Sequence, residues 1–264
     1  MRKNEIIYYK DELNDDFARN KIKTAKLPDD FAYVNKNIFF VFFGFFFYHF
    51  FARPLIFIFI KFNYLARLKN RKVLRAVRGK GYFIYGNHTS DLLDAFRPNT
   101  LGLIRKNYIA ANPDAFSIKG IKTIVAMLGA IPTIDNDFRH HAKLLSAIEY
   151  RIKQKSTVTI YPERHIWPYY TGIRPFTCAS FHFPVKLDTP VVALTTTYHK
   201  RRYLLKWMKK PRVVHYLDGP FYPDSSLSIP AAKQQIRNKV YEAMLKRATA
   251  VEQYEYIKYV KTAE

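Results

Sequence analysis

The chain has 264 residues and a mass of 31.2 kDa, enough for one or two domains that bury a real hydrophobic core. It carries 44 Lys and Arg against 21 Asp and Glu, a formal net charge of +23, and 48% of its residues are hydrophobic. This hydrophobic content excludes a disordered basic tail. The single cysteine, Cys178, excludes an intramolecular disulfide framework and a cysteine-based zinc site. The charge predicts an anionic partner: nucleic acid, a membrane surface, or a phosphorylated or coenzyme-bearing substrate.

The positive charge is concentrated in two stretches of the chain. Residues 1–37 are close to neutral, with 8 basic and 7 acidic side chains. Residues 61–80 contain 8 basic side chains and no acidic one, and residues 200–212 contain 7 basic side chains and again no acidic one. Two acid-free runs in one chain favour an anion-facing surface over a merely solvated face.

A very apolar segment separates the neutral start from the first basic run. Residues 38–60 read IFFVFFGFFFYHFFARPLIFIFI, with one charge, at Arg53, followed at once by Pro54. A membrane-spanning helix needs roughly 20 apolar residues, and a helix without a polar face is either lipid-exposed or deeply buried. We therefore predict a membrane-associated part over residues 38–66.

Two geometries are open for this part. Pro54 allows a single kinked helix or a two-helix hairpin that dips into one leaflet and returns. The hairpin is preferred, because it would keep Arg53 near polar headgroups rather than at mid-bilayer. The basic run that follows is typical of a cytoplasmic flank that faces anionic lipid, so the rest of the chain is placed on the cytoplasmic side.

From residue 81 onward, short β-rich runs alternate with helical stretches. This alternation predicts a mixed α/β fold with a largely buried sheet flanked by helices. The domain organisation is then a near-neutral segment (1–37), the membrane-associated part (38–66) and an α/β domain (67–264) that ends in an amphipathic helix. The expected strands are 82–85, 108–111, 157–161, 191–197 and 212–217, and the expected helices lie near 92–103, 117–129, 138–154 and 230–259.

Polar clusters follow two of the expected strands. The strand at 82–85 is followed by GNHTSDLLD, which contains Asn87, His88 and Asp94, and the strand at 157–161 runs into YPERHIWP. In open α/β sheets, active residues gather at the carboxyl ends of strands. A histidine whose one ring nitrogen is held by a carboxylate can remove a proton from a substrate hydroxyl with the other. A structural histidine that caps a turn is the alternative.

Four blocks, in order, resemble the glycerolipid acyltransferase superfamily, and in particular bacterial 1-acyl-glycerol-3-phosphate (lysophosphatidate) acyltransferases. The blocks are GNHTSDLLD, the Ile-Pro block LGAIPTID (128–135), the aromatic-Pro-Glu block YPERHIWP with its continuation IRPF (173–176), and the Pro-Val-Val strand TPVVAL (189–194). Together they span about residues 80–220. The resemblance implies that His88 is the general base, that a carboxylate orients it, and that Asn87 and Glu163 belong to the substrate site.

The sequence departs from the family pattern in three places. Four residues usually separate the histidine from the aspartate; here that place is Leu93, so Asp94, one residue later, is preferred over Asp91 as the orienting carboxylate. The family's Glu-Gly-Thr-Arg is replaced by Glu-Arg-His-Ile. The substrate phosphate is therefore expected to meet Arg164 or Arg174, with a contribution from His165.

The second block departs as well. It lacks the family's arginine directly after Ile-Pro, so Arg139 or Lys143 could reach the phosphate, although a solvated helix face is an equal alternative for both. No metal site is predicted, since the adjacent His140 and His141 would diverge on a helix.

The resemblance implies direct acyl transfer from acyl-CoA or acyl carrier protein to the hydroxyl of a lysophospholipid, with backbone N–H groups of the turn stabilising the oxyanion. No cofactor is expected beyond that co-substrate, and the expected partners are membrane lipids and the acyl thioester donor, not nucleic acid. Two alternatives keep the fold: a different acceptor (glycerol-3-phosphate, another lipid or an amine) or a degenerate lipid-binding protein. A third is a basic nucleic-acid-binding protein, since aromatics interleave with the basic residues at 198–212.

Overall fold

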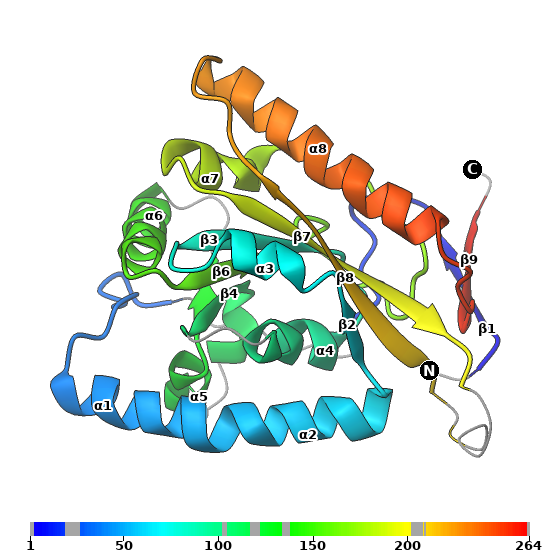
Figure 1. Ribbon diagram of the computed structural model, residues 1–264, viewed down its shortest axis with the longest axis horizontal. Helices are drawn as coiled ribbons and strands as arrows, with labels where there is room; N and C mark the ends of the chain where they lie inside the picture. Colours follow the sequence, from blue (N-terminus) through cyan, green and yellow to red (C-terminus); the bar gives the residue numbers. More distant parts are fainter. Residues whose placement is uncertain are drawn as a thin grey trace.

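The computed structural model describes residues 3–18, 27–101, 105–116, 122–133, 138–201, 208 and 210–262. Its centre is a seven-stranded sheet in which every neighbouring pair of strands is parallel except β7 and β8 (Figure 1). The strands, in spatial order, are β2 (Arg67–Lys69), β8 (Arg212–Phe221), β7 (Val191–His199), β3 (Tyr82–Gly86), β6 (Thr157–Ile160), β4 (Asn107–Ala111) and β5 (Ala130–Pro132). The mixed α/β class with a central sheet flanked by helices is confirmed.

Helices cover both faces of the sheet, which explains why its central strands β3, β6 and β7 are buried at nearly every position. The connecting helices are α3 (Lys72–Ala76), α4 (Asp91–Phe96), α5 (Lys122–Met127), α6 (Phe138–Lys153), α7 (His182–Lys186) and α8 (Ile229–Thr249), with short 3₁₀ turns η2 (Arg97–Thr100), η3 (Pro113–Phe116) and η4 (Ala179–Phe181). In Figure 1, α8 runs along the top of the molecule and the long N-terminal helix along the bottom, with the sheet between them.

Each face of the sheet has its own core. On one face, Phe83 and Tyr85 of β3 pack with α6, α7 and α8, whose buried residues include Ile148 and Ile236. On the other, Ile84 packs with α3 and with the buried positions of β7 and β8. Since successive residues of β3 point to opposite faces, one five-residue strand anchors both layers.

The apolar N-terminal segment is one continuous helix, not a hairpin. It consists of α1 (Ile38–Phe46), the π-helical turn η1 (Phe47–Ala52) and α2 (Arg53–Tyr64), and as a whole it is long and apolar enough to cross a membrane. Pro54 has no N–H and its ring would clash with a carbonyl four residues earlier in a regular α-helix. The wider π turn, in which the Arg53 N–H bonds to the Tyr48 carbonyl, lies just before the proline. The preferred hairpin is therefore wrong, because the chain passes the proline without reversing.

One stripe of this helix packs against the α/β domain along nearly its full length. Its buried residues, Gly44, Tyr48, Ala52, Ile60 and Tyr64, are spaced at multiples of four. The Tyr48 hydroxyl donates to Asn99 Oδ1 (2.8 Å), and Ile60 and Tyr64 join a cluster with residues of α4, β7 and β8. The helix therefore lies along the domain and does not project away from it.

The two ends of the chain meet in a separate two-stranded sheet that the sequence did not predict. β1 (Glu5–Tyr9) pairs in parallel with β9 (Ile257–Lys261). The predicted C-terminal helix is therefore too long, since α8 ends at Thr249 and the chain returns to extended structure. Two other expected helices are also shorter: 92–103 becomes α4 followed by η2, and of 117–129 the described part is helical only over α5.

The first basic run faces solvent, and every Lys and Arg between residues 61 and 80 is exposed. Most of the second basic run, 202–207 and 209, lies outside the described residues. One of its described members, Arg201, is buried and donates to the Asn63 carbonyl at the end of α2 (2.5 Å), so it ties the β7–β8 connection to the long helix.

Lys106 is a partly buried lysine just before β4, and it yields a stability prediction. Its Nζ lies over the rings of Tyr48 and Tyr108 and donates to the Met127 carbonyl. Burial, with a further effect of Arg151, lowers the pKa of Lys106 from 10.5 to about 7. Between these two values the unfolded chain binds one more proton than the folded chain, so the free energy of unfolding should rise with pH.

The slope is at most about 1.4 kcal/mol per pH unit. Lys106→Met should remove this dependence and stabilise the protein at and below pH 7. Thermal unfolding of both forms between pH 6 and 10 checks it, and an equal rise in the two forms would contradict it. Lys143→Met is the control, since Lys143 lies on an exposed part of α6.

Candidate active site

The predicted base and its orienting carboxylate meet at the carboxyl end of β3. His88 lies two residues after the end of β3, and Asp94 lies in the first turn of α4. His88 Nδ1 is 2.8 Å from Asp94 Oδ2, and the side chains are 17% and 4% exposed. Asp94, and not Asp91, thus makes the contact, and the added residue of this sequence is accommodated within the α4 turn. With Nδ1–H donated to the carboxylate, the imidazole presents Nε2 as the available proton acceptor.

Backbone N–H groups hold both carboxylates of the site. Asp94 Oδ2 also accepts from the N–H groups of Thr89 (2.8 Å) and Ser90 (2.9 Å), and the Glu163 carboxylate accepts from the N–H of His88 (3.0 Å). The three consecutive N–H groups of the turn are therefore engaged. As placed, these three N–H groups do not provide the oxyanion contact expected of the turn.

Glu163 and Arg174 form a buried ion pair behind the turn that carries His88. Glu163 follows β6, the neighbour of β3, so its carboxylate reaches the backbone of His88. Arg174 Nη2 lies 3.3 Å from Glu163 Oε2, with both side chains fully buried, and the Arg174 N–H donates to Glu163 Oε1 (3.1 Å). Burial raises the pKa of Glu163, while the Arg174 charge and these hydrogen bonds oppose the rise.

These positions do not support the predicted substrate contacts of Glu163 and Arg174, because neither side chain reaches the surface. The same holds for Asn87, which is 1% exposed and whose amide bonds to both the N–H and the carbonyl of Thr196 on β7. Of the predicted phosphate-binding residues, Arg164 is exposed and His165 is partly buried near Asp16 (3.6 Å).

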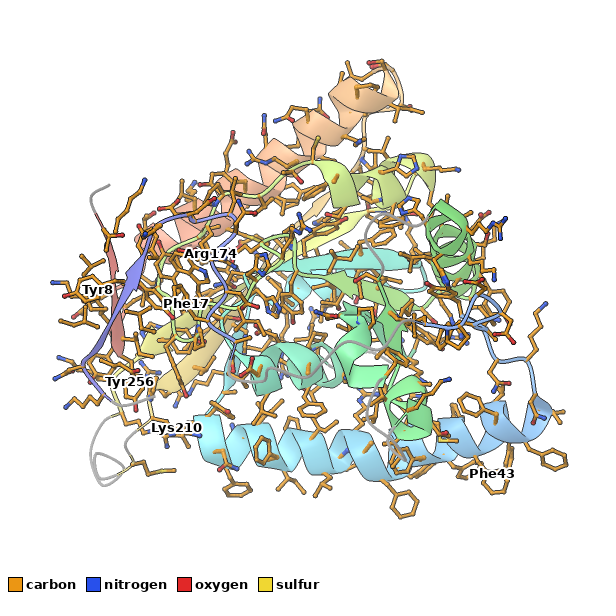
Figure 2. The ribbon with its side chains drawn as sticks, turned by 180° about the vertical axis from the view of Figure 1, so that it is seen from behind. Tyr8, Phe17, Phe43, Arg174, Lys210 and Tyr256 are labelled. Carbon is orange, nitrogen blue, oxygen red and sulfur yellow. The ribbon has the colours of Figure 1, made fainter. Side chains whose placement is uncertain are left out.

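The N-terminal segment covers the back of this loop, a feature that sequence reasoning missed. The Arg174 guanidinium donates to the Glu12 carbonyl (3.3 Å), and Trp167 Nε1 donates to the Asp15 carbonyl (2.8 Å). Figure 2 shows Arg174 and Phe17 on the same side of the molecule, near β1. The acidic residues at 11–16 gave a local charge signal, but nothing in their order indicated which part of the chain they would contact.

The second block is only partly described. Ile131 and Pro132 end β5, whereas residues 134–137 lie outside the described part of the chain. Lys143 donates to the Asp29 carbonyl, and Arg139 is exposed in the first turn of α6. No group of three or more His, Cys, Asp and Glu side chains suited to a metal ion occurs among the described residues.

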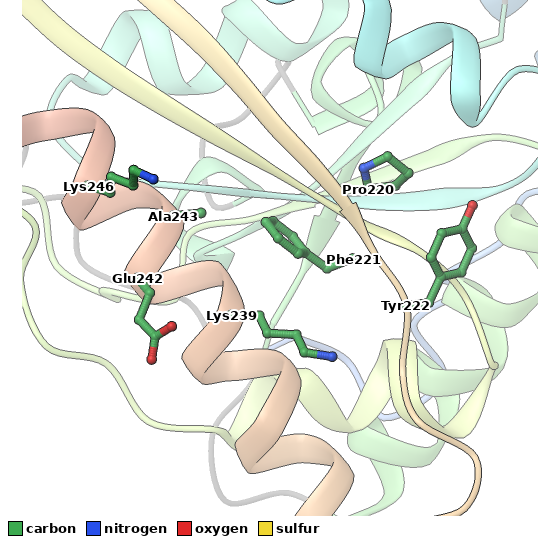
Figure 3. Close-up of a pocket in the computed structure, with 7 residues that line it drawn as sticks. All are labelled: Pro220, Phe221, Tyr222, Lys239, Glu242, Ala243 and Lys246. Atoms are coloured by element: carbon green, nitrogen blue, oxygen red, sulfur yellow. The ribbon is translucent and has the colours of Figure 1, made fainter. Parts of the chain in front are cut away.

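A cleft of about 630 Å³ lies between β8 and α8 (Figure 3). It lies at the opposite end of the sheet from the dyad. Phe221 of its floor pairs with Val191, which is level with Phe83 near the start of β3, whereas His88 follows the end of that strand. This cleft is therefore not part of the His88–Asp94 site.

Comparison with known proteins identifies the family and a similar fold. The acyltransferase family profile matches residues 66–197, half of the chain, from the end of the long helix through most of β7. The chain belongs to the acyltransferase family. Its fold is similar to the crystal structure of the 1-acyl-sn-glycerophosphate (LPA) acyltransferase PlsC from Thermotoga maritima, with a TM-score of 0.53, 14% sequence identity, and coverage of 82% of this chain and 89% of that chain. No curated protein matches the sequence.

In this acyltransferase, the matched region contains both members of the dyad, the Glu163–Arg174 pair and the strands that position them. The long N-terminal helix and α8 lie outside it. The family match thus covers the chemistry-bearing part of the sheet, and the structural similarity extends over most of the rest.

Proposed function

We propose that the protein transfers a fatty acyl group from acyl-CoA or acyl carrier protein to the free hydroxyl of a lysophospholipid such as 1-acyl-glycerol-3-phosphate. The observation that carries the proposal is the 2.8 Å contact of His88 Nδ1 with Asp94, at the carboxyl end of a parallel strand in an acyltransferase-family chain. The structural similarity to an LPA acyltransferase supports the acceptor class.

The proposed reaction proceeds in one displacement. His88 Nε2 takes the proton of the acceptor hydroxyl while Asp94 stabilises the imidazolium that forms. The acceptor oxygen attacks the thioester carbonyl carbon, the new C–O bond forms, the C–S bond breaks, and the imidazolium returns its proton to the leaving thiolate. The Glu163–Arg174 pair holds the backbone of His88 and does not touch the reacting atoms.

The test is an assay of the purified full-length chain in detergent with labelled acyl-CoA or acyl carrier protein and a panel of acceptors. The panel contains lysophosphatidate, other lysophospholipids, glycerol-3-phosphate and a long-chain amine. Preferential formation of phosphatidate is the expected result. Preferential acylation of glycerol-3-phosphate or of the amine would show that the acceptor is not a lysophospholipid. If no acceptor were acylated, the proposed enzymatic function would be refuted.

The long helix supports membrane association in the plane of the bilayer. Its packed stripe runs along the domain, so a perpendicular span would draw the domain into the hydrocarbon. Its remaining faces expose an unusually large set of apolar side chains, which Figure 2 shows projecting away from the domain. The set comprises Ile38, Phe39, Val41, Phe42, Phe43, Phe45, Phe46, Phe50, Phe51, Leu55, Phe57, Ile58, Phe59 and Phe62. An exposed apolar surface of this kind marks a membrane or protein contact, and the exposed basic run at 61–80 favours anionic headgroups.

Replacing three outward side chains of this helix by serine should weaken binding to anionic vesicles. Phe51, Leu55 and Phe62 are 67–69% exposed, so the change should leave the fold intact. Each side chain would lose part of the ~1.5–3 kcal/mol gained when a large apolar group leaves water, so binding should fall about 10- to 100-fold. Vesicle co-sedimentation checks this.

The matched control replaces three exposed apolar residues elsewhere, Tyr8, Tyr222 and Leu227, by serine. Vesicle binding should be unchanged in this control. If both triple variants lost binding equally, or if neither did, the long helix would not be the membrane contact.

A further inference from the structure

Tyr161 touches both members of the dyad, although neither the mechanism nor the substrate contacts above use it. Its ring stacks on the His88 imidazole, with centroids 4.7 Å apart and planes 17° apart. Its hydroxyl donates to the backbone carbonyl of Asp94 (2.7 Å). Tyr161 directly follows β6, so the same strand end that supplies Glu163 supplies this ring.

The contact with the Tyr161 ring restrains the outer side-chain torsion of His88, which the Asp94 carboxylate alone does not fix. The outer torsion of a histidine side chain is broad and roughly two-fold. The Asp94 contact fixes where Nδ1 lies but allows the ring to swing about that hydrogen bond. A ring stacked at 17° limits the swing, and so it fixes the direction in which Nε2 presents its lone pair.

The Tyr161 hydroxyl supplies a hydrogen-bond donor that α4 itself lacks for the Asp94 carbonyl. In an α-helix the Asp94 carbonyl would accept from the N–H four residues later, but that residue is Pro98, which has no N–H. The helix ends at Phe96, so this carbonyl is among the last four and needs an outside donor. Burial and the nearby Asp94 charge raise the pKa of Tyr161 well above its ordinary value, so the phenol keeps the proton it donates.

Gly86 provides the space for this arrangement. A Cβ on Gly86 would lie 2.7 Å from Cε1 of Tyr161, closer than carbon atoms approach, and its φ is not in the left-handed region. Glycine at this position is thus required by the neighbouring ring and not by its own backbone conformation. An alanine here would push the ring off its place beside His88 while leaving Tyr161 in the sequence.

We propose that Tyr161 is a positioning residue that sets the orientation of the His88–Asp94 dyad through its ring and its hydroxyl together, in the space that Gly86 leaves. The role rests on the proposed function, since it acts through the proposed base. The hydroxyl holds the backbone of the orienting residue, and the ring holds the plane of the base.

Three variants separate the two contacts. Tyr161→Phe keeps the ring and loses the hydroxyl, Tyr161→Leu loses both, and Gly86→Ala displaces an unchanged tyrosine. Tyr241→Leu, at a half-buried tyrosine on α8 packed against Phe176, is the control for loss of a ring in the core. Gly44→Ala is the control for an added methyl group, since a Cβ there would make only an ordinary contact with Met127 (3.6 Å).

Kinetics give the first readout. Displacement of a catalytic group by about 1 Å costs on the order of 10²-fold, so Tyr161→Leu and Gly86→Ala should lower kcat about 10- to 100-fold with little change in KM. Tyr161→Phe should retain more activity than either. The pH profile of kcat should also shift in Tyr161→Leu and stay unchanged in Tyr241→Leu.

The second readout is independent of acyl transfer. Nitrogen NMR of the His88 imidazole, assigned with His88→Ala, should show a single tautomer with Nδ1–H in the wild type and a mixture in Tyr161→Leu. A folded Tyr161→Leu protein with the wild-type tautomer and wild-type kcat would overturn the positioning role. If instead His88→Ala retained turnover, the proposed base would fail, while the NMR signal would still decide whether Tyr161 orients the imidazole.

Discussion

His88→Ala is expected to lower the rate of acyl transfer by about 10²–10⁴-fold, the usual contribution of a positioned general base. The protein should remain folded and bound to vesicles, because the variant keeps the His88 backbone N–H that donates to Glu163 and the His88 carbonyl that accepts from the Trp167 N–H. The measurement is kcat with the donor and acceptor that the panel assay selects. Turnover within threefold of the wild type would refute the role of His88 as the base.

The control is His141→Ala, at an exposed histidine on α6, which should retain full activity. Asp94→Asn and Asp91→Asn test the orienting carboxylate in the same turn of α4. An amide at Asp94 can donate to Nδ1 and favour the wrong imidazole tautomer, so the loss should be large there and small at Asp91. A larger loss at Asp91 would contradict the 2.8 Å contact as the catalytic one.

Arg174→Met is expected to lower the free energy of unfolding by about 3–5 kcal/mol, the usual cost of removing one partner of a buried ion pair. The change leaves the Glu163 carboxylate fully buried beside the backbone of His88 without its cation. Thermal unfolding in detergent measures the loss. Burial raises the pKa of Glu163 in the folded protein above its ordinary value of 4.5. As the pH rises above 4.5, the folded chain therefore binds more protons than the unfolded chain, and the free energy of unfolding should fall. In acid Glu163 is protonated and needs no cation, so the stability lost in Arg174→Met should be smaller there.

Two further variants make this prediction specific. The double variant Glu163→Gln with Arg174→Met removes both charges and should be less destabilised than Arg174→Met alone. Arg247→Met breaks the Arg247–Asp218 pair, whose side chains are 28% and 18% exposed, and should cost about 1 kcal/mol or less. Equal losses at Arg174 and Arg247 would show that burial does not set the strength of the Glu163 pair.

The sequence predicted the central strands well because they are buried on both sides and are rich in apolar, aromatic and β-branched residues. The expected strand at 82–85 matches β3 to within one residue, and that at 157–161 matches β6 equally closely. β2 and β5 are three residues each and carry no such signal. The strands at the two ends of the chain were not predicted, for another reason. β1 and β9 stabilise each other although more than 240 residues separate them, and a local sequence pattern cannot indicate such a pairing.

The candidate site also has a part that the sequence predicted and a part that only the fold decided. Residue identity and order singled out His88 and a nearby aspartate, because a base and its orienting carboxylate must lie within a few residues or be brought together by the fold. The sequence could not distinguish a charged residue that faces substrate from one that holds the backbone. Arg174 and Glu163 were expected at the substrate, and packing against β6 and the N-terminal segment placed them behind the turn instead.

By itself, the amino-acid sequence determined the α/β class and the apolar helix and singled out His88 as the candidate base, since each of these follows from composition, periodicity or motifs of residues close together in the chain. Only the tertiary structure decided that the helix passes Pro54 without reversing, that Asp94 holds His88, and that Tyr161 lies on the imidazole. These outcomes depend on which groups the folded chain brings within hydrogen-bonding or van der Waals distance of one another. The sequence likewise set the net charge of +23, whereas the fold decided that every Lys and Arg of the run at 61–80 is exposed and that Arg174 is buried.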